Sequence, residues 1–176
     1  MKLIIPEKLT SMLLSSGNEI ETRLLEDLVS FHEERYIKKH KPLPERPSRL
    51  LGQNGLHYLQ MCLFRSRSLV DGFFVSVESD NPILSALTTR AHFEVTGGIA
   101  YFLKKLKNFY NGVITYEQID ESLGRLNLGI KTKSNLEGVE IERIPDPVNV
   151  MSFIQAADHE FKKNKQQRYY VFSRIL

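Results

Sequence analysis

The chain has 176 residues, of which 41% are hydrophobic and 26% charged, and its formal net charge is +3 at pH 7. This length suits one domain with a hydrophobic core, and the composition indicates neither a disordered nor a fibrous protein. The charge is weaker than that of a dedicated duplex-binding protein, so it permits nucleic-acid binding without demanding it. We expect a single domain over residues 1–176.

The only cysteine, Cys62, cannot form an intramolecular disulfide, which favours a reducing compartment. The amino-terminal apolar run is too short for a signal peptide, and no run of about 18 apolar residues could span a bilayer. We therefore expect a cytoplasmic protein of bacterial type without a membrane partner.

Apolar residues at helical spacing predict a first long helix over residues 18–39, with a stripe of Ile20, Leu24, Leu28 and Phe31. A connector follows over residues 40–54, because proline does not continue a helix and disfavours helical backbone in the residue before it. This segment contains Pro42, Pro44 and Pro47.

Two long helices are predicted over residues 55–78 and 82–110, with Asn81 as the cap of the second and Pro82 in its first turn. The turn between them is short, so the two helices should form an antiparallel hairpin. The stripe of the first comprises Leu56, Leu59, Leu63, Val70, Phe74 and Val77. That of the second comprises Leu84, Leu87, Ala91, Val95, Gly98, Phe102, Leu106 and Phe109.

The remaining elements are shorter. Asn111-Gly112 should end the hairpin, and Thr115 with Gln118 forms a capping box that opens a helix to about residue 126. An irregular connection is expected over residues 127–146, with one short strand or extended arm at Val139 and Ile141. A last helix should run from Asp146-Pro147 to about residue 163. The fold class is therefore an all-α helical bundle built on the long hairpin.

Equal rise along two antiparallel helices predicts which residues of the hairpin share a height. On this basis Arg67, Asp71 and His92 lie together on one edge. A carboxylate could orient the imidazole, and the cation could hold a phosphate. Asp71 and His92 are thus candidate catalytic residues, although a salt bridge and a surface histidine are the more ordinary interpretations.

Arg90 and Glu94 are expected on the opposite edge as an i,i+4 ion pair near Gly97-Gly98, where helices can approach closely. We expect this pair to be buried and structural, while Arg90 is also a candidate phosphate ligand. Removing one partner of such a buried pair should cost about 3–5 kcal/mol.

Other motifs are weaker. Arg35 and His40 match the arginine and histidine spacing of many helical ribonucleases, but such a match arises readily by chance and a cationic helix end is the more ordinary interpretation. His57 and His159 lack partners at ligand spacing, so no metal is expected. No nucleotide-binding or nucleophile motif occurs, so no cofactor is expected.

Part of the chain resembles a family of uncharacterised bacterial helical proteins whose bundles are similar to the HEPN (higher eukaryotes and prokaryotes nucleotide-binding) class. The similar residues are Asn81-Pro82, Arg90 and Glu94, then 147–151 and 156–158, within a span from Leu56 to Ser173. The resemblance implies an all-α bundle and nucleotide or RNA handling, often in phage defence or toxin–antitoxin systems.

The resemblance also implies a continuation with a His-Pro-Asn motif, whereas this chain ends in the apolar segment 169–176. We therefore expect a carboxy-terminally truncated product that self-associates, with catalysis in doubt. Two functions follow from the sequence. One is binding of a nucleotide or RNA phosphate through Arg67 and Arg90. The alternative is a non-catalytic protein-interaction or dimerisation module, as a homo-oligomer or with a protein partner.

Overall fold

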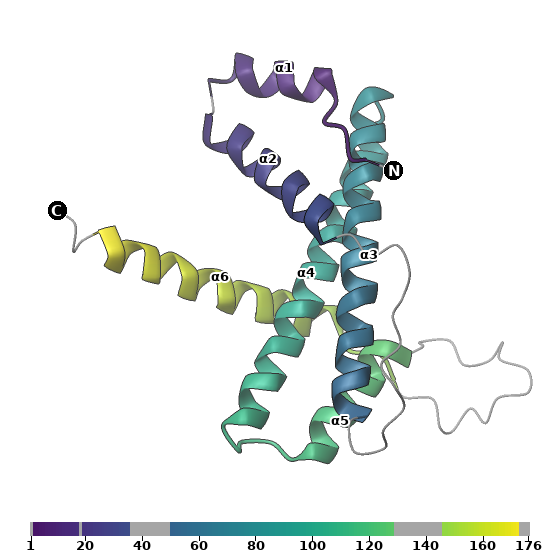
Figure 1. Ribbon diagram of the computed structural model, residues 1–176, viewed down its shortest axis with the longest axis vertical. Helices are drawn as coiled ribbons and strands as arrows, with labels where there is room; N and C mark the ends of the chain where they lie inside the picture. The colour runs from purple at the N-terminus through teal and green to yellow at the C-terminus, as the bar shows by residue number, and fades with distance from the viewer. Residues whose placement is uncertain (1, 18, 36–49, 129–145, 173–176) are drawn as a thin grey trace, which may run out of the picture. The chain divides into compact units, whose positions relative to one another are not determined.

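The computed structural model describes residues 2–17, 19–35, 50–128 and 146–172. This part of the chain contains no strand, and its helices confirm the all-α class (Figure 1). The helices are α1 (Glu7–Ser15), α2 (Glu19–Glu34), α3 (Leu50–Glu78), α4 (Pro82–Tyr110), α5 (Tyr116–Leu128) and α6 (Val150–Phe172). Within the described residues, none of these helices combines the length and apolar character needed to cross a membrane.

The chain forms two compact units, and α3 and α4 contribute residues to each. The first unit comprises Met1–Lys41 and Leu59–Val95, and the second comprises Pro42–Tyr58 and Thr96–Leu176. The expected single domain over residues 1–176 stays a prediction.

The ends of the helices follow the local chemistry predicted from the sequence. Asn81 Oδ1 accepts a hydrogen bond from Leu84 N at 3.0 Å, which caps α4. At its other end Gly112 takes φ 69°, and Val113 N donates to Asn108 O at 2.9 Å in a Schellman motif.

The capping box of α5 is also present. Thr115 N donates to Gln118 Oε1 at 2.9 Å, and Gln118 N donates to Thr115 Oγ1 at 3.4 Å. Each side chain therefore satisfies a backbone donor of the other.

Several predicted boundaries are wrong. Helix α1 was not expected, α2 ends at Glu34, and residues 50–54 belong to α3 rather than to the connector. Helix α6 begins at Val150, where Asn149 Oδ1 accepts a hydrogen bond from Met151 N at 2.9 Å, and it continues to Phe172. The rest of the connector and the proposed arm at Val139 and Ile141 lie outside the described residues.

The core of the first unit joins the amino-terminal segment to α2 and α3. Leu3, Val70 and Phe74 are buried at its centre, and partly buried apolar residues surround them: Ile5, Leu9, Leu25, Leu28, Val29 and Phe73. Helix α2 thus faces the core with Leu25, Leu28 and Val29, whereas three residues of its predicted stripe, Ile20, Leu24 and Phe31, are exposed. The apolar stripe that predicts the helix is therefore not the side of α2 that packs on the core.

The antiparallel hairpin forms with the predicted heights. Ser76 Oγ lies 2.6 Å from Ser85 Oγ, and a Cβ added to Gly72 would lie 3.3 Å from Thr88 Cγ2. The apolar stripes are only partly covered, because Leu56 and Leu87 are exposed.

The close helix packing expected at Gly97-Gly98 is found in the second unit. A Cβ at Gly97 would lie 2.9 Å from both the Cβ and the carbonyl oxygen of Phe153 in α6. A Cβ at Gly98 would collide with the Tyr58 hydroxyl. Glycine is therefore required at Gly97, where the close atoms belong to the backbone of α6, whereas at Gly98 the Tyr58 side chain would have to shift.

Candidate functional site

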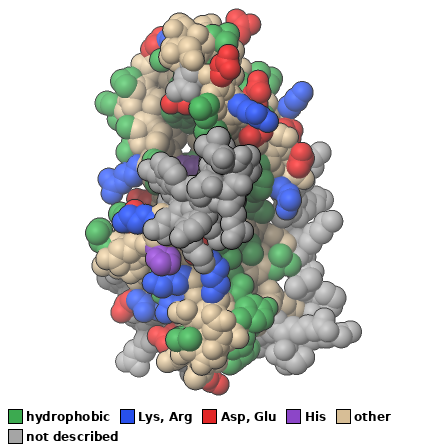
Figure 2. Space-filling model, turned by 90° about the vertical axis from the view of Figure 1, so that its left-hand side faces the viewer, with side chains coloured by type: hydrophobic (Ala, Val, Ile, Leu, Met, Phe, Trp, Pro, Cys, Tyr) green, Lys and Arg blue, Asp and Glu red, His purple; other side chains and the backbone are tan. Residues whose placement is uncertain are grey.

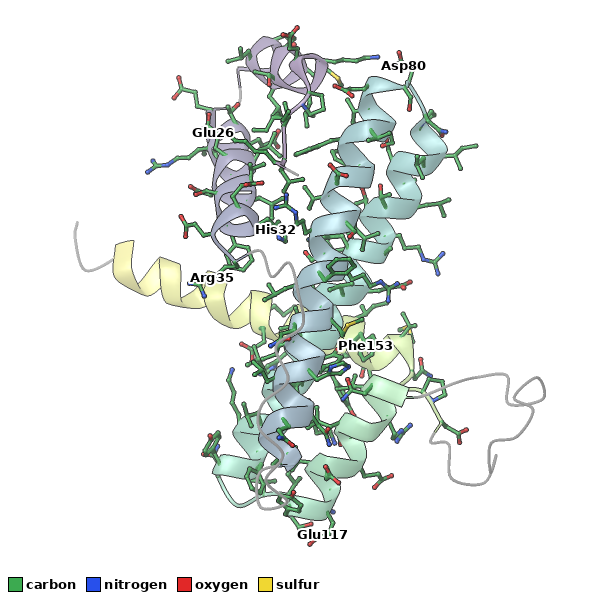
Figure 3. All side chains as sticks on the ribbon, turned by 45° about the vertical axis from the view of Figure 1, so that its right-hand side comes forward. Glu26, His32, Arg35, Asp80, Glu117 and Phe153 are labelled. Atoms are coloured by element: carbon green, nitrogen blue, oxygen red, sulfur yellow. The ribbon has the colours of Figure 1, made fainter. Side chains whose placement is uncertain are left out.

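A serine between two histidines lies in the interior of the first unit. Ser66 Oγ on α3 is 2.8 Å from His92 Nε2 on α4 and 3.3 Å from His32 Nε2 on α2. Figure 3 shows His32 extending from α2 toward α3. This cluster joins three helices through one hydroxyl group.

Both imidazoles of this cluster favour the neutral form. Burial lowers the pKa of His32, and the nearby His92 and Arg67 lower it further. Burial also lowers the pKa of His92. Because the Ser66 hydroxyl has one hydrogen to donate, at least one ring must donate its Nε2 hydrogen to Ser66 Oγ for both bonds to form.

An ion pair lies beside the cluster. Arg67 Nη1 donates to Glu33 Oε1 at 3.1 Å and to His32 O at 3.3 Å, and Arg67 is only 7% exposed. Leu3 N donates to the same Glu33 oxygen at 2.7 Å. The hydrogen bond from Leu3 N lowers the pKa of Glu33 most, and the hydrogen bond from Arg67 lowers it further. Partial burial of the Glu33 carboxylate raises this pKa but does not cancel the effect of the hydrogen bonds.

Arg67 and His92 of the predicted grouping bond to residues outside it, and the grouping with Asp71 stays a prediction. Arg67 pairs with Glu33 and His92 bonds Ser66. No ion pair among the described residues joins Asp71 to either of them. The sequence analysis overlooked Ser66, His32 and Glu33, since nothing local in α2 indicates which side faces α3.

The second predicted pair forms but is not buried. Arg90 Nε lies 3.4 Å from Glu94 Oε1, and the Arg90 side chain is 78% exposed. The expected burial is therefore wrong, because Arg90 lies on the outer side of α4 within its own unit. A solvated i,i+4 pair of this kind contributes only about 0.3–0.5 kcal/mol.

The remaining candidates gain no shared site. Arg35 lies over the Phe31 ring at 5.9 Å, whereas His40 is outside the described residues. In the described ranges, no three His, Cys, Asp or Glu side chains gather closely enough to bind a metal ion.

The chemistry of the cluster is better explained by packing than by catalysis. A neutral base 2.8 Å from a hydroxyl is a geometry that nucleophilic catalysis uses. A nucleophile must also reach its substrate, yet Ser66 is only 9% exposed. The hydrogen bonds instead satisfy buried polar atoms and position α2 on α3 and α4.

The two lowered histidine pKa values predict acid destabilisation. Between the ordinary value of 6.5 and the lower folded values, the unfolded chain binds more protons than the folded chain. The free energy of unfolding should therefore fall as the pH drops below 6.5, and chemical denaturation measured above pH 4.5, where Glu33 ordinarily titrates, isolates this effect. His32→Gln should flatten the dependence, and equal stability of the wild type across this range would contradict it.

Comparison with known proteins identifies no family for this chain. No protein-family model, curated protein or solved structure matches the chain. The proposals below therefore depend on the residues of this chain alone.

Proposed function

We propose that this protein is a non-catalytic interaction module that self-associates through the outer side of α2. The observation that carries this proposal is an apolar stripe without cover on that helix. Ile20 is 72% exposed, Leu24 57% and Phe31 45%. Hydrophobic side chains also reach the surface of the upper part in Figure 2, among charged ones.

The spacing of the stripe suits a second helix. Ile20, Leu24, Asp27 and Phe31 follow one another at intervals of four, three and four residues, the pattern of a coiled-coil seam. Because Leu25, Leu28 and Val29 pack on the core, α2 is apolar on two sides. An exposed apolar stripe on a helix whose other side is already packed indicates a binding surface.

The charges beside the stripe favour a second copy of the chain as the partner. Helix α2 has Glu19 near its start and Glu34 at its end, with Arg23 in its first half and Arg35 just after it. In an antiparallel pair with Ile20 opposite Phe31, Glu19 of one copy would lie within about one helical turn of Arg35 of the other. Opposite charges at the edges of an interface favour this orientation.

Binding of RNA or a nucleotide by an HEPN-like protein in a defence or toxin–antitoxin context is the other proposal. It relies on Arg67 and Arg90 as phosphate ligands. The Arg67 guanidinium is already bonded to Glu33 and to the His32 carbonyl, which leaves Arg90 as the exposed candidate of the two. Because phosphate binding usually draws on several cations, the apolar stripe supports self-association more strongly.

Sedimentation velocity over a concentration series tests the proposal. Helix α2 has 16 residues, so a contact about 24 Å long is available, and such a small interface implies a dissociation constant of about 1–100 µM. Leu24→Glu should weaken the dimer at least about tenfold, because it replaces a central apolar side chain of the seam with a second charge near Asp27.

Phe64→Glu is the matched control, since Phe64 is an exposed apolar residue on α3 of the same unit. It should leave the dissociation constant unchanged. A wild-type monomer at all concentrations would overturn the proposal. Salt-dependent RNA binding by that monomer, lost in Arg90→Ala, would establish the alternative.

A further inference from the structure

A cavity of about 170 Å³ opens beside His92 in the first unit. Helices α2, α3 and α4 all contribute to its walls. Most of the surface is apolar and includes Leu25, Leu28, Leu69, Phe73, Phe74 and Phe93. The cavity is independent of the outer stripe of α2, because Leu25 and Leu28 lie on the core side of that helix.

The volume of the cavity limits the size of the molecule that can bind in it. Apolar cavities of about 150 Å³ lined by leucine and phenylalanine stay dry and take up a single benzene ring. The present cavity is of the same size. It therefore suits one six-membered ring with a small substituent and is too small for a nucleotide.

The polar groups of the wall select against a charged occupant. Thr88 Oγ1 donates within α4, at 2.9 Å from Leu84 O and 3.0 Å from Ser85 O. His92 Nε2 is bonded to Ser66 Oγ, and none of the described residues that line the cavity is an Asp, Glu, Lys or Arg. A charged ligand would lose its hydration there without gaining a partner of opposite charge.

The phenylalanine side chains of the wall favour an aromatic ligand. Phe73 and Phe74 are neighbours with ring centroids 6.3 Å apart and planes tilted by 55°, so they present differently oriented ring surfaces. Phe93 is 64% exposed and forms part of the lining, which gives the cavity a side open to solvent. Edge-to-face or offset contacts between aromatic rings stabilise binding beyond the area that the rings bury.

We propose that this cavity is a binding site for a small, uncharged, single-ring aromatic molecule. Entry beside Phe93 places the ring between α2 and the hairpin, against Phe73 and Phe74. Binding there would hold α2 on α3 and α4, and the ligand should raise the thermal midpoint of the wild-type protein logarithmically with its free concentration above the dissociation constant.

Fluorobenzene observed by ¹⁹F NMR is the probe for this site. We expect saturable binding with a dissociation constant of about 0.1–1 mM. Benzoate and benzylammonium have the same ring with opposite charges, and both should compete at least tenfold more weakly than toluene. Competition by either ion as strong as by toluene would overturn the proposed selectivity.

Leu69→Phe tests the location, because it adds volume inside the cavity and should weaken fluorobenzene binding at least tenfold. Val75→Phe adds the same ring at an exposed position of α3 and should leave binding unchanged. If Leu69→Phe does not fold, the wild type alone decides through size: toluene should displace the probe and anthracene should not. Absence of saturable binding by the folded wild type, or equal binding by Leu69→Phe, would overturn the proposal.

Discussion

Gly97→Ala is expected to lower the free energy of unfolding by about 1–3 kcal/mol. The new methyl group would lie 2.9 Å from the Phe153 carbonyl oxygen and 3.0 Å from its carbonyl carbon. These are backbone atoms of α6, so the helix itself has to move. The gain in helix propensity, about 1 kcal/mol, does not offset the lost packing. Chemical denaturation of the variant beside the wild type measures the difference.

Gly124→Ala is the matched control in the same unit. Gly124 lies inside α5, and a Cβ there would meet no atom within 4 Å. The substitution should therefore stabilise the protein by about 0.5–1 kcal/mol. If both alanine variants were stabilised equally, the close approach of α4 and α6 at Gly97 would be refuted.

Arg67→Met is expected to destabilise the protein by about 2–4 kcal/mol, although methionine keeps much of the side-chain volume. The substitution removes the donor to the buried His32 carbonyl and the partner of Glu33. It also removes one of the polar contacts that join α2 to α3, so the loss should appear in the thermal midpoint. Glu33→Gln should act in the same direction, because Leu3 N and Arg67 then lose a charged acceptor.

Arg90→Met is the matched control for Arg67→Met. The Arg90 side chain is 78% exposed, and among the described residues it pairs with its own helix neighbour Glu94 at 3.4 Å. Its loss should change stability by no more than about 0.5 kcal/mol. A larger effect of Arg90→Met than of Arg67→Met would contradict the assignment of Arg67 as the interior cation.

The sequence by itself determined the features that depend on a few neighbouring residues. Asn81 caps α4, Gly112 closes it, and Thr115 with Gln118 opens α5, because each interaction joins atoms within five residues of one another. The antiparallel hairpin also followed, since a short turn between two long periodic segments brings them side by side. Equal rise along both helices then fixed which residues share a height, as Ser76 and Ser85 do.

Only the tertiary structure decided which partners the polar side chains take. Helix α2 has apolar residues on two sides, so its periodicity could not tell that Leu25 and Leu28 face the core while Ile20 and Leu24 face solvent. The choice of side brings His32 to Ser66 and Glu33 to Arg67, across more than 30 positions of sequence. The tertiary structure likewise shows that Arg90 is exposed on the hairpin. Local spacing gives no information about contacts of this range, because they arise when one helix docks on others and their energy is gained only in the assembled core.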